Sequence, residues 1–301
     1  MRGILIAGCV ILALVIGCKA EKTSHVEKLQ GPPLVIGLIP EQDIFSQVER
    51  YTPLAEYLSR KIGRKIELKM LTRYGNIVNN FVSSGMDGAF FGSFTYTLAH
   101  AKLGVEVLVR PVSLDGTSTY YGLLFVRKDS GITSIKDMKG KRFVFVDKAT
   151  TAGYLLPLEY FRHHGVKNYK TYLGETYFAG THEDAILDVL EKKADIGAAK
   201  NTVFERLANN DPRINRELLV LMKSPEVPEN ALAVRRGLDE TLTQGIKVTL
   251  LTMDDEAEGR AVLKTFGAQR FIETTDKDYA PVIEYAREAG INLSTYDYLH
   301  N

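Results

Sequence analysis

Short apolar segments alternate with amphipathic helical segments along most of this chain, and they do so in two separate series. The first series opens with LVIGLI at residues 34–39, a continuous apolar run typical of a buried parallel strand. Further strands are expected at residues 65–70, 87–91 and 105–112, with helical patterns between them. The order β-α-β-α-β-α-β predicts an α/β lobe with a mostly parallel sheet flanked by helices.

A second series begins at residue 143, after an isolated strand expected at 119–127. The elements expected in it are strands at 143–146, 169–173, 194–199 and 217–222 and helices at 154–164, 183–192 and 202–208. After a proline-rich break come an isolated strand at 231–235 and helical patterns at 240–253, 254–266 and 278–289. We expect two lobes, the second inserted into the first, with crossing segments near 119–127 and 228–236.

The predicted lobe boundaries are 34–120 plus 228–301 for lobe 1 and 121–227 for lobe 2. Pockets form preferentially between domains, and hinge closure can bury a ligand there. The cleft between the lobes is therefore the expected binding site.

The turn after the strand at 143–146 predicts an anion site. Thr150, Thr151, Ala152 and Gly153 lie between this strand and the start of a helix. The first N–H groups of a helix have no partner within it and carry partial positive charge, so they attract anions. The two hydroxyls add donors, and the glycine allows close approach to the backbone. The alternative is that one threonine only caps the helix.

Gly92 and Ser93 repeat this arrangement at the end of the strand at 87–91. Ser93 is either an N-cap or part of a second helix end that faces an anion. Ligands of open α/β sheets bind outside the carboxyl ends of the strands, where both turns lie.

The N-terminus reads as an export signal. One arginine precedes an apolar run that ends at Val15-Ile16-Gly17-Cys18, which is short for a span of about 20 residues. Residues 1–18 resemble a lipoprotein signal peptide with Cys18 as the lipidated residue; an uncleaved membrane anchor is the alternative. Residues 19–33 are polar and predict a flexible tether. We expect an extracytoplasmic, membrane-anchored monomer.

Composition excludes several classes of function. The net charge is +1, so no nucleic-acid-binding surface is expected. No GxSxG, HExxH or P-loop motif occurs, and the neighbouring His163 and His164 point to different helix faces. We expect no enzyme activity, no metal and no cofactor.

Eight short segments add information through their order and spacing: IGLIP (36–40), DGAFFGSFTY (87–96), TYY (119–121), DSGI (129–132), DMKGK (137–141), TTAGY (150–154), GTHEDAI (180–186) and ADIGAA (194–199). Together they resemble the substrate-binding proteins of phosphate, phosphite and phosphonate ABC transporters, the PhnD-like periplasmic binding proteins. The resemblance covers residues 34 to about 292 and implies a two-lobed periplasmic-binding-protein fold of type II, with two crossover segments.

The resemblance also implies a site for a phosphorus oxyanion. Thr150, Thr151 and the N–H groups near Ala152 and Gly153 would hold it, in a turn that reads Thr-Thr-Ala-Gly where the family usually has Ser-Thr-Ser-Gly. The other side chains implied at the site are Tyr74 and Tyr120 from the first lobe and His182 from the second. Each has a plainer alternative: the tyrosines line the lobe interface, and His182 neighbours a helix cap.

Selectivity for an amino group is doubtful on this resemblance. Phosphonate binders that grip an amino group use carboxylates, and the corresponding position is Lys200 or Asn201, neither of which is acidic. Lys200 is otherwise a solvated lysine, and Glu229 is a possible substitute carboxylate. The predicted function is a solute-binding lipoprotein that delivers a small phosphorus oxyanion to an ABC permease. A lipoprotein that signals to a sensor kinase, or an enzyme on the same fold, are the alternatives.

Overall fold

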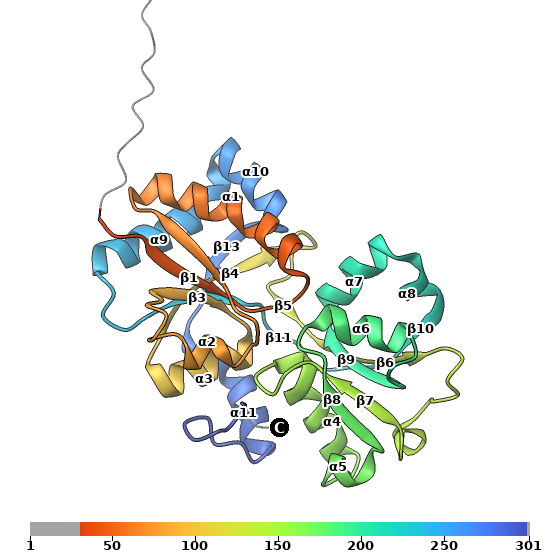
Figure 1. Cartoon of the computed structure of the whole chain (residues 1–301). Helices are drawn as coiled ribbons and strands as arrows, with labels where there is room; N and C mark the ends of the chain where they lie inside the picture. Colours follow the sequence, from red (N-terminus) through yellow and green to blue (C-terminus); the bar gives the residue numbers. More distant parts are fainter. Residues whose placement is uncertain (1–30, 300–301) are drawn as a thin grey trace, which may run out of the picture.

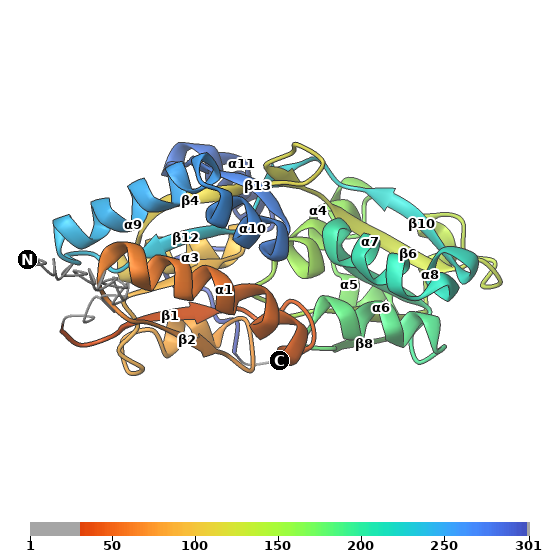
Figure 2. The same cartoon turned by 90° about the horizontal axis from the view of Figure 1, so that it is seen from above.

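The computed structural model describes residues 31–299, so the predicted signal peptide, its Cys18 and most of the tether lie outside the described residues. Figure 1 shows two lobes, each built on a sheet with helices around it. The view in Figure 2 shows the same lobes end to end along the long axis of the molecule. The predicted two-lobed α/β fold is confirmed. Within residues 31–299, no helix combines the length and the apolar character needed to cross a membrane.

The sheet of the first lobe has six strands in the order β13-β4-β12-β3-β1-β2. These strands are β1 (Leu34–Leu38), β2 (Ile66–Met70), β3 (Gly88–Phe91), β4 (Glu106–Ser113), β12 (Ala231–Val234) and β13 (Ala268–Glu273). β1 pairs in parallel with β2 and β3, whereas β12 and β13 are antiparallel to their partners. Because β12 lies between β3 and β4, the late part of the chain completes the sheet that the early part begins.

Two groups of helices cover this sheet. They are α1 (Ile44–Ile62), α9 (Glu240–Thr252) and α10 (Ala257–Phe266) in one apolar cluster, and α2 (Asn76–Asn79), α3 (Ser93–Leu103) and α11 (Ala280–Glu288) in another. The Asp43 side chain caps α1 by accepting from the N–H groups of Phe45 and Ser46, and α1 ends at Gly63 with φ +65°. Pro53 lies inside α1.

The sheet of the second lobe has the order β10-β6-β9-β7-β8. Its strands are β6 (Gly122–Arg127), β7 (Arg142–Phe145), β8 (Glu175–Phe178), β9 (Ile196–Lys200) and β10 (Leu218–Lys223). Its helices are α4 (Leu156–His163), α5 (Tyr169–Tyr172), α6 (His182–Leu190), α7 (Asn201–Asn210) and α8 (Pro212–Glu217). β7 is parallel to β8 and β9, and β6 is antiparallel to both of its neighbours.

The chain passes between the lobes at a small two-stranded ladder. β5 (Thr119–Tyr120) pairs antiparallel with β11 (Val227–Pro228), and Figure 1 places both labels between the lobes. The strand predicted at 119–127 is therefore two strands, β5 and β6, which belong to different sheets. The predicted lobe boundaries at 120/121 and 227/228 fall at this ladder and stay predictions.

Two other expectations are wrong, and one strand was not predicted. The strand predicted at 169–173 is the single-turn helix α5, because Asn168 accepts a hydrogen bond from the N–H of Lys170 and starts a turn; the strand is β8. The helical pattern expected between the strands at 65–70 and 87–91 shortens to α2. Strand β13, after Gly267 with φ +92°, was not predicted. Because β12, β13 and β6 run against their neighbours, both sheets are mixed rather than simply parallel.

The segment after α11 reaches the second lobe. The hydroxyl of Tyr296 donates to the carbonyl of Lys148 at 3.2 Å. The Tyr296 ring lies 5.9 Å from the ring of Phe94, at the start of α3. Tyr296 thus contacts both lobes beside the turn that leads to α4.

Candidate functional site

Two helix N-termini, one from each lobe, meet between the lobes. In the first lobe, α3 begins at Ser93 directly after β3. In the second lobe, a π-helical turn at Thr151–Leu155 follows β7 and continues into α4. The N–H of Phe94 donates to Thr151 Oγ1 at 2.8 Å, and Thr95 Oγ1 donates to the carbonyl of Ala149 at 2.9 Å. The ends of the two helices, with their partial positive charges, are therefore in direct contact across the lobe interface.

Neither threonine of the turn caps the helix with its side chain. Thr150 occupies the N-cap position, but its hydroxyl donates to the carbonyl of Asp147 at 2.7 Å within the turn. Thr151 uses its hydroxyl to accept from the first lobe. Both residues are buried, at 2% and 3% exposure. The capping alternative is therefore wrong, and the hydroxyls lie at the contact between the lobes.

The π-helical turn was not foreseen from the sequence. Such turns are rare and occur frequently at functional sites. Ala152 and Gly153 lie in it and are buried. A Cβ at Gly153 would lie 2.4 Å from the side chain of Val146, so the space beside this glycine is filled. On its Cβ side, the glycine lets the turn pack directly on the end of the strand, and the expected approach of a ligand to its backbone N–H stays a prediction.

Ser93 and Tyr120 connect α3 to the crossing ladder. Gly92, not Ser93, holds the N-cap position of α3. The Ser93 hydroxyl is hydrogen-bonded to the Tyr120 hydroxyl at 3.1 Å and donates to the carbonyl of Pro228. Ser93 is thus not an N-cap; it joins the helix end to both strands of the ladder.

Tyr74 and His182 approach each other from opposite lobes. Their rings lie 5.8 Å apart in an edge-to-face arrangement, and both side chains are buried. The hydroxyl of Tyr74 has no hydrogen-bond partner among the described residues. Both tyrosines, Tyr74 and Tyr120, line the interface between the lobes. Thr181 caps α6 and His182 is the next residue, so His182 does neighbour a helix cap, and its side chain is buried.

The hydrogen bonds of His182 define its protonation. The ring Nδ1 accepts from the backbone N–H of Lys200 at 3.2 Å. Separately, the backbone N–H of His182 donates to the carbonyl of Glu41 at 3.2 Å. Burial lowers the pKa of the imidazole to about 3, so the ring is neutral at pH 7. A neutral ring that accepts at Nδ1 carries its proton at Nε2. His182 therefore presents an N–H donor.

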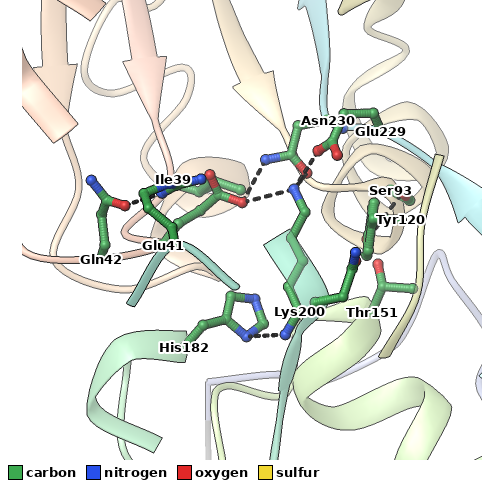
Figure 3. Close-up of polar contacts among 12 residues, drawn as sticks. Ile39, Glu41, Gln42, Ser93, Tyr120, Thr151, His182, Lys200, Glu229 and Asn230 are labelled. Carbon is green, nitrogen blue, oxygen red and sulfur yellow. Dashed lines mark hydrogen bonds and ion pairs between the residues drawn. The ribbon is translucent and has the colours of Figure 1, made fainter. Parts of the chain in front are cut away.

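Lys200, at the end of β9, is enclosed between the lobes (Figure 3). Its Nζ lies 3.1 Å from Glu41 Oε1 and 3.3 Å from Asn230 Oδ1, and it forms an ion pair with Glu229. It also lies 4.4 Å from the ring centroid of Tyr120. The lysine is 4% exposed, so the alternative of a solvated lysine is wrong.

The charges of this cluster reinforce one another. Burial alone lowers the pKa of Lys200, but attraction to Glu229 and Glu41 outweighs it and raises the pKa above its usual range. Burial raises the pKa of Glu41, but the positive charges of Lys200, Arg50 and Arg206 outweigh it and lower the pKa to about 2. Lys200 and Glu41 are therefore both charged at pH 7.

Asn201 holds the crossing segment. Its Oδ1 accepts from the N–H of Tyr121 at 3.0 Å, and its Nδ2 donates to Glu205 at 3.4 Å. Both of its side-chain groups thus bond to protein partners. Asn201, just after β9, therefore holds the residue that precedes β6.

Glu41 and Asn230 were not foreseen as site residues. Glu41 follows Pro40 just beyond the carboxyl end of β1, and Asn230 follows β11. The rule that placed the two hydroxyl-rich turns at strand ends could also have found Glu41. Asn230 had no such signal. Its Nδ2 donates to Glu41 at 2.8 Å, which fixes the carboxylate next to Lys200 (Figure 3).

A cavity of about 310 Å³ opens beside this cluster. Both lobes line it, with Arg50 and Pro111 from the first and Thr202 and Arg206 from the second. Lys200 also lines it, together with Glu41, Glu229 and Asn230. The cluster therefore lies where the interlobe space meets the surrounding solvent.

This chain is similar to known transport proteins. The phosphonates-binding periplasmic protein of Escherichia coli (strain K12) is 26% identical over 87% of this chain and 78% of the relative. The probable ABC transporter phosphite binding protein PhnD1 of Prochlorococcus marinus (strain MIT 9301) is 24% identical over 85% of this chain and 89% of its own length.

Solved structures show the same fold. A binding protein component of an ABC phosphonate transporter from Pseudomonas aeruginosa superposes with a TM-score of 0.81 at 24% identity, over 87% of each chain. PhnD1 in complex with methylphosphonate gives a TM-score of 0.78 at 23% identity, over 88% of this chain and 99% of that one.

A family model described as "ABC transporter, phosphonate, periplasmic substrate-binding protein" matches residues 36–279. This match spans both lobes and the crossing ladder. The chain belongs to the family of periplasmic substrate-binding proteins of phosphonate ABC transporters.

Proposed function

We propose that this protein captures a small phosphorus oxyanion between its lobes and delivers it to an ABC permease. The observation that carries the proposal is the meeting of two helix N-termini, from α3 and from the π-helical turn, at buried hydroxyls. Helix ends favour a negatively charged ligand through free N–H groups and the helix dipole. The relatives named for phosphonates and phosphite, and the relative solved with methylphosphonate, bind ligands of this charge class.

In this proposal, the donors surround the anion from both lobes. Thr150, Thr151 and the N–H groups of Ala152 and Gly153 contribute from the second lobe, together with the Nε2–H of His182. Ser93 and the hydroxyls of Tyr74 and Tyr120 complete the donor set. In the structure, the Thr151 hydroxyl bonds to Phe94. A ligand that binds here takes over this bond and links the same two helix ends through its own oxygens.

The role is binding rather than catalysis. The relatives are substrate-binding components of transporters. Capture and release of a solute are therefore the function that we propose for the site. Opening of the lobes at the β5/β11 ladder then releases the ligand to the permease.

Isothermal titration calorimetry tests the proposal directly. The purified chain is titrated with phosphate, phosphite, methylphosphonate and, as a control of similar shape, methanesulfonate. We expect saturable binding of at least one phosphorus oxyanion, and a loss of affinity in a Thr150→Ala/Thr151→Ala variant. Thr171→Ala, whose exposed hydroxyl bonds to the carbonyl of Asn168, is the control. Absence of binding by all three phosphorus compounds contradicts the proposal.

We also propose that the protein is anchored to a membrane through a lipid on Cys18. The sequence pattern Val15-Ile16-Gly17-Cys18 supports this. In its native host, the full chain should incorporate a labelled fatty acid, and Cys18→Ala should not. Absence of label from the full chain, or equal labelling of both chains, contradicts lipidation at Cys18.

A further inference from the structure

The ammonium group of Lys200 is enclosed by groups that proteins use to recognise cations. Two carboxylates, from Glu41 and Glu229, and the side-chain Oδ1 of Asn230 accept its hydrogen bonds. The face of the Tyr120 ring lies 4.4 Å away, within the range of a cation–π interaction. An ammonium has three donors and no acceptor, so these three oxygens use all of its hydrogen-bonding capacity.

This cation cage combines residues from both lobes. Glu41 follows β1, and Tyr120, Glu229 and Asn230 lie in or next to the crossing ladder, whereas Lys200 ends β9 of the second lobe. Two carboxylates in a buried place require positive charge to compensate them. The chain supplies this charge itself, from a side chain that crosses between the lobes (Figure 3).

The cage lies next to the proposed oxyanion site, and Tyr120 belongs to both. The ring face of Tyr120 contacts the ammonium of Lys200, and its hydroxyl bonds to Ser93 at the start of α3. A substituent on a bound phosphorus atom that extends along the Tyr120 ring therefore meets the ammonium of Lys200. An incoming ammonium at this point would face a like charge and filled acceptors.

We propose that Lys200 is a specificity-determining residue that occupies the cation cage of the interlobe site and thereby excludes ligands with a positively charged substituent. This inference rests on the proposed function. It assigns the ligand to phosphorus oxyanions with no cationic group, such as phosphite, phosphate or methylphosphonate. It excludes aminoalkylphosphonates, whose amino group is protonated at pH 7.

Lys200→Ala removes most of this selectivity, because it takes away the ammonium that is hydrogen-bonded to the carboxylates of Glu41 and Glu229, while Arg50 and Arg206 act on Glu41 only through their charge. The emptied cage then accepts the ammonium of a ligand or of a free amine. Lys223→Ala is the matched control, since Lys223 is an exposed lysine that also packs on a tyrosine, with its Nζ 5.2 Å from the Tyr121 ring. This control keeps the cage intact.

Calorimetry of the full chain with methylphosphonate and 2-aminoethylphosphonate tests the inference. We expect wild type and Lys223→Ala to bind methylphosphonate at least about 100-fold more tightly than 2-aminoethylphosphonate, and Lys200→Ala to lose most of this preference. In addition, millimolar methylammonium should raise the melting temperature of Lys200→Ala and not that of wild type. This second readout needs no phosphorus ligand.

The outcomes separate the two proposals. If wild type binds both ligands equally tightly, Lys200 does not determine specificity, although the proposed function stands. If wild type binds no phosphorus oxyanion, the proposed function fails and the inference fails with it. Should Lys200→Ala not fold, Lys200→Met, which keeps the aliphatic part of the side chain and removes the charge, takes its place, and an unchanged preference in the folded variant overturns the inference.

Discussion

The N–H of Phe94, in the first turn of α3, donates to Thr151 Oγ1 of the second lobe at 2.8 Å. This bond joins the two helix ends that form the proposed anion site. Each end belongs to a different sheet, so the bond exists only when the lobes are in contact. The acceptor at Thr151 is therefore expected to matter both for closure and for binding.

Thr151→Val removes this acceptor while keeping the shape of the side chain. We expect the affinity for the phosphorus oxyanion to fall by about 1.5–3 kcal/mol, because a hydrogen bond to a charged ligand is lost. Calorimetry measures the change. Thr171→Val is the control, because its exposed hydroxyl bonds only within α5 and its neighbouring turn. Unchanged affinity in Thr151→Val would remove Thr151 from the site.

Tyr74→Phe should separate binding from stability. Its buried hydroxyl has no partner among residues 31–299, so its removal should leave the free energy of unfolding unchanged or higher. Oxyanion binding should weaken by about 1.5–3 kcal/mol, because the ligand loses a donor. Tyr172→Phe should show the opposite pattern, a loss of stability without a loss of oxyanion binding. Its hydroxyl donates to the carbonyl of Ile135 at 2.8 Å and takes no part in the proposed site. A stability loss without a binding loss in Tyr74→Phe contradicts the assignment.

Gly153→Ala should destabilise the second lobe. Its new Cβ would lie 2.4 Å from Val146, and overpacking of this kind costs about 1–3 kcal/mol. Gly245→Ala is the matched control, because a Cβ at this helical glycine lies 3.8 Å from Ile62 and alanine is the better helix former by about 1 kcal/mol. The midpoints of urea unfolding of the two variants should shift in opposite directions. Adding Val146→Ala to Gly153→Ala should partly restore its stability, because the smaller side chain leaves room for the new Cβ.

As the pH falls from about 6.5 to about 4.5, the free energy of unfolding should decrease because of His182. Burial lowers its pKa to about 3 in the folded protein, below its ordinary 6.5, so in this range the unfolded chain binds the proton and the folded chain does not. The free energy of unfolding therefore decreases by about 1.4 kcal/mol per pH unit as the pH falls. In His182→Asn, the Oδ1 can accept from the N–H of Lys200 in place of Nδ1. The free energy of unfolding of this variant should depend less on pH in this range. An unchanged slope in the variant contradicts a neutral, buried His182.

Glu41→Gln should cost far more than the same change on the surface. It leaves Lys200 with one carboxylate in a buried place, and breaking a buried ion pair costs about 3–5 kcal/mol. Glu258→Gln is the control, because Glu258 pairs with Arg60 in an exposed position, where such pairs contribute about 0–1 kcal/mol. Denaturant unfolding measures both. Equal losses would show that the Lys200 cluster adds nothing to stability.

Local signals in the sequence predict the frame of the site. The apolar run at 143–146, followed by two threonines and a helix, predicts the turn that the structure shows, and Gly92-Ser93 marks the opposing helix start. These features depend on neighbouring residues only. The short helix α5 escaped prediction because its aromatic residues, such as Tyr169, fit a strand as well, and the cap from Asn168 decided the outcome.

The surroundings of Lys200 could not be predicted from local patterns. Its partners lie 159, 29 and 30 residues away along the chain, at Glu41, Glu229 and Asn230. No spacing or periodicity connects these positions, because they meet only after both lobes and the ladder have formed. The sequence pointed to Lys200 and Glu229 separately, and the fold joins them.

Tyr296 extends beyond the helices of the first lobe to bond with the carbonyl of Lys148, which lies just before the anion-facing turn. When the lobes separate at the ladder, the hydrogen bond between Tyr296 and Lys148 must either break or move with the second lobe. The environment of the segment around Tyr296 should therefore change when a ligand is captured or released. A fluorophore on the exposed Ser294 should change its signal when an oxyanion draws the lobes together.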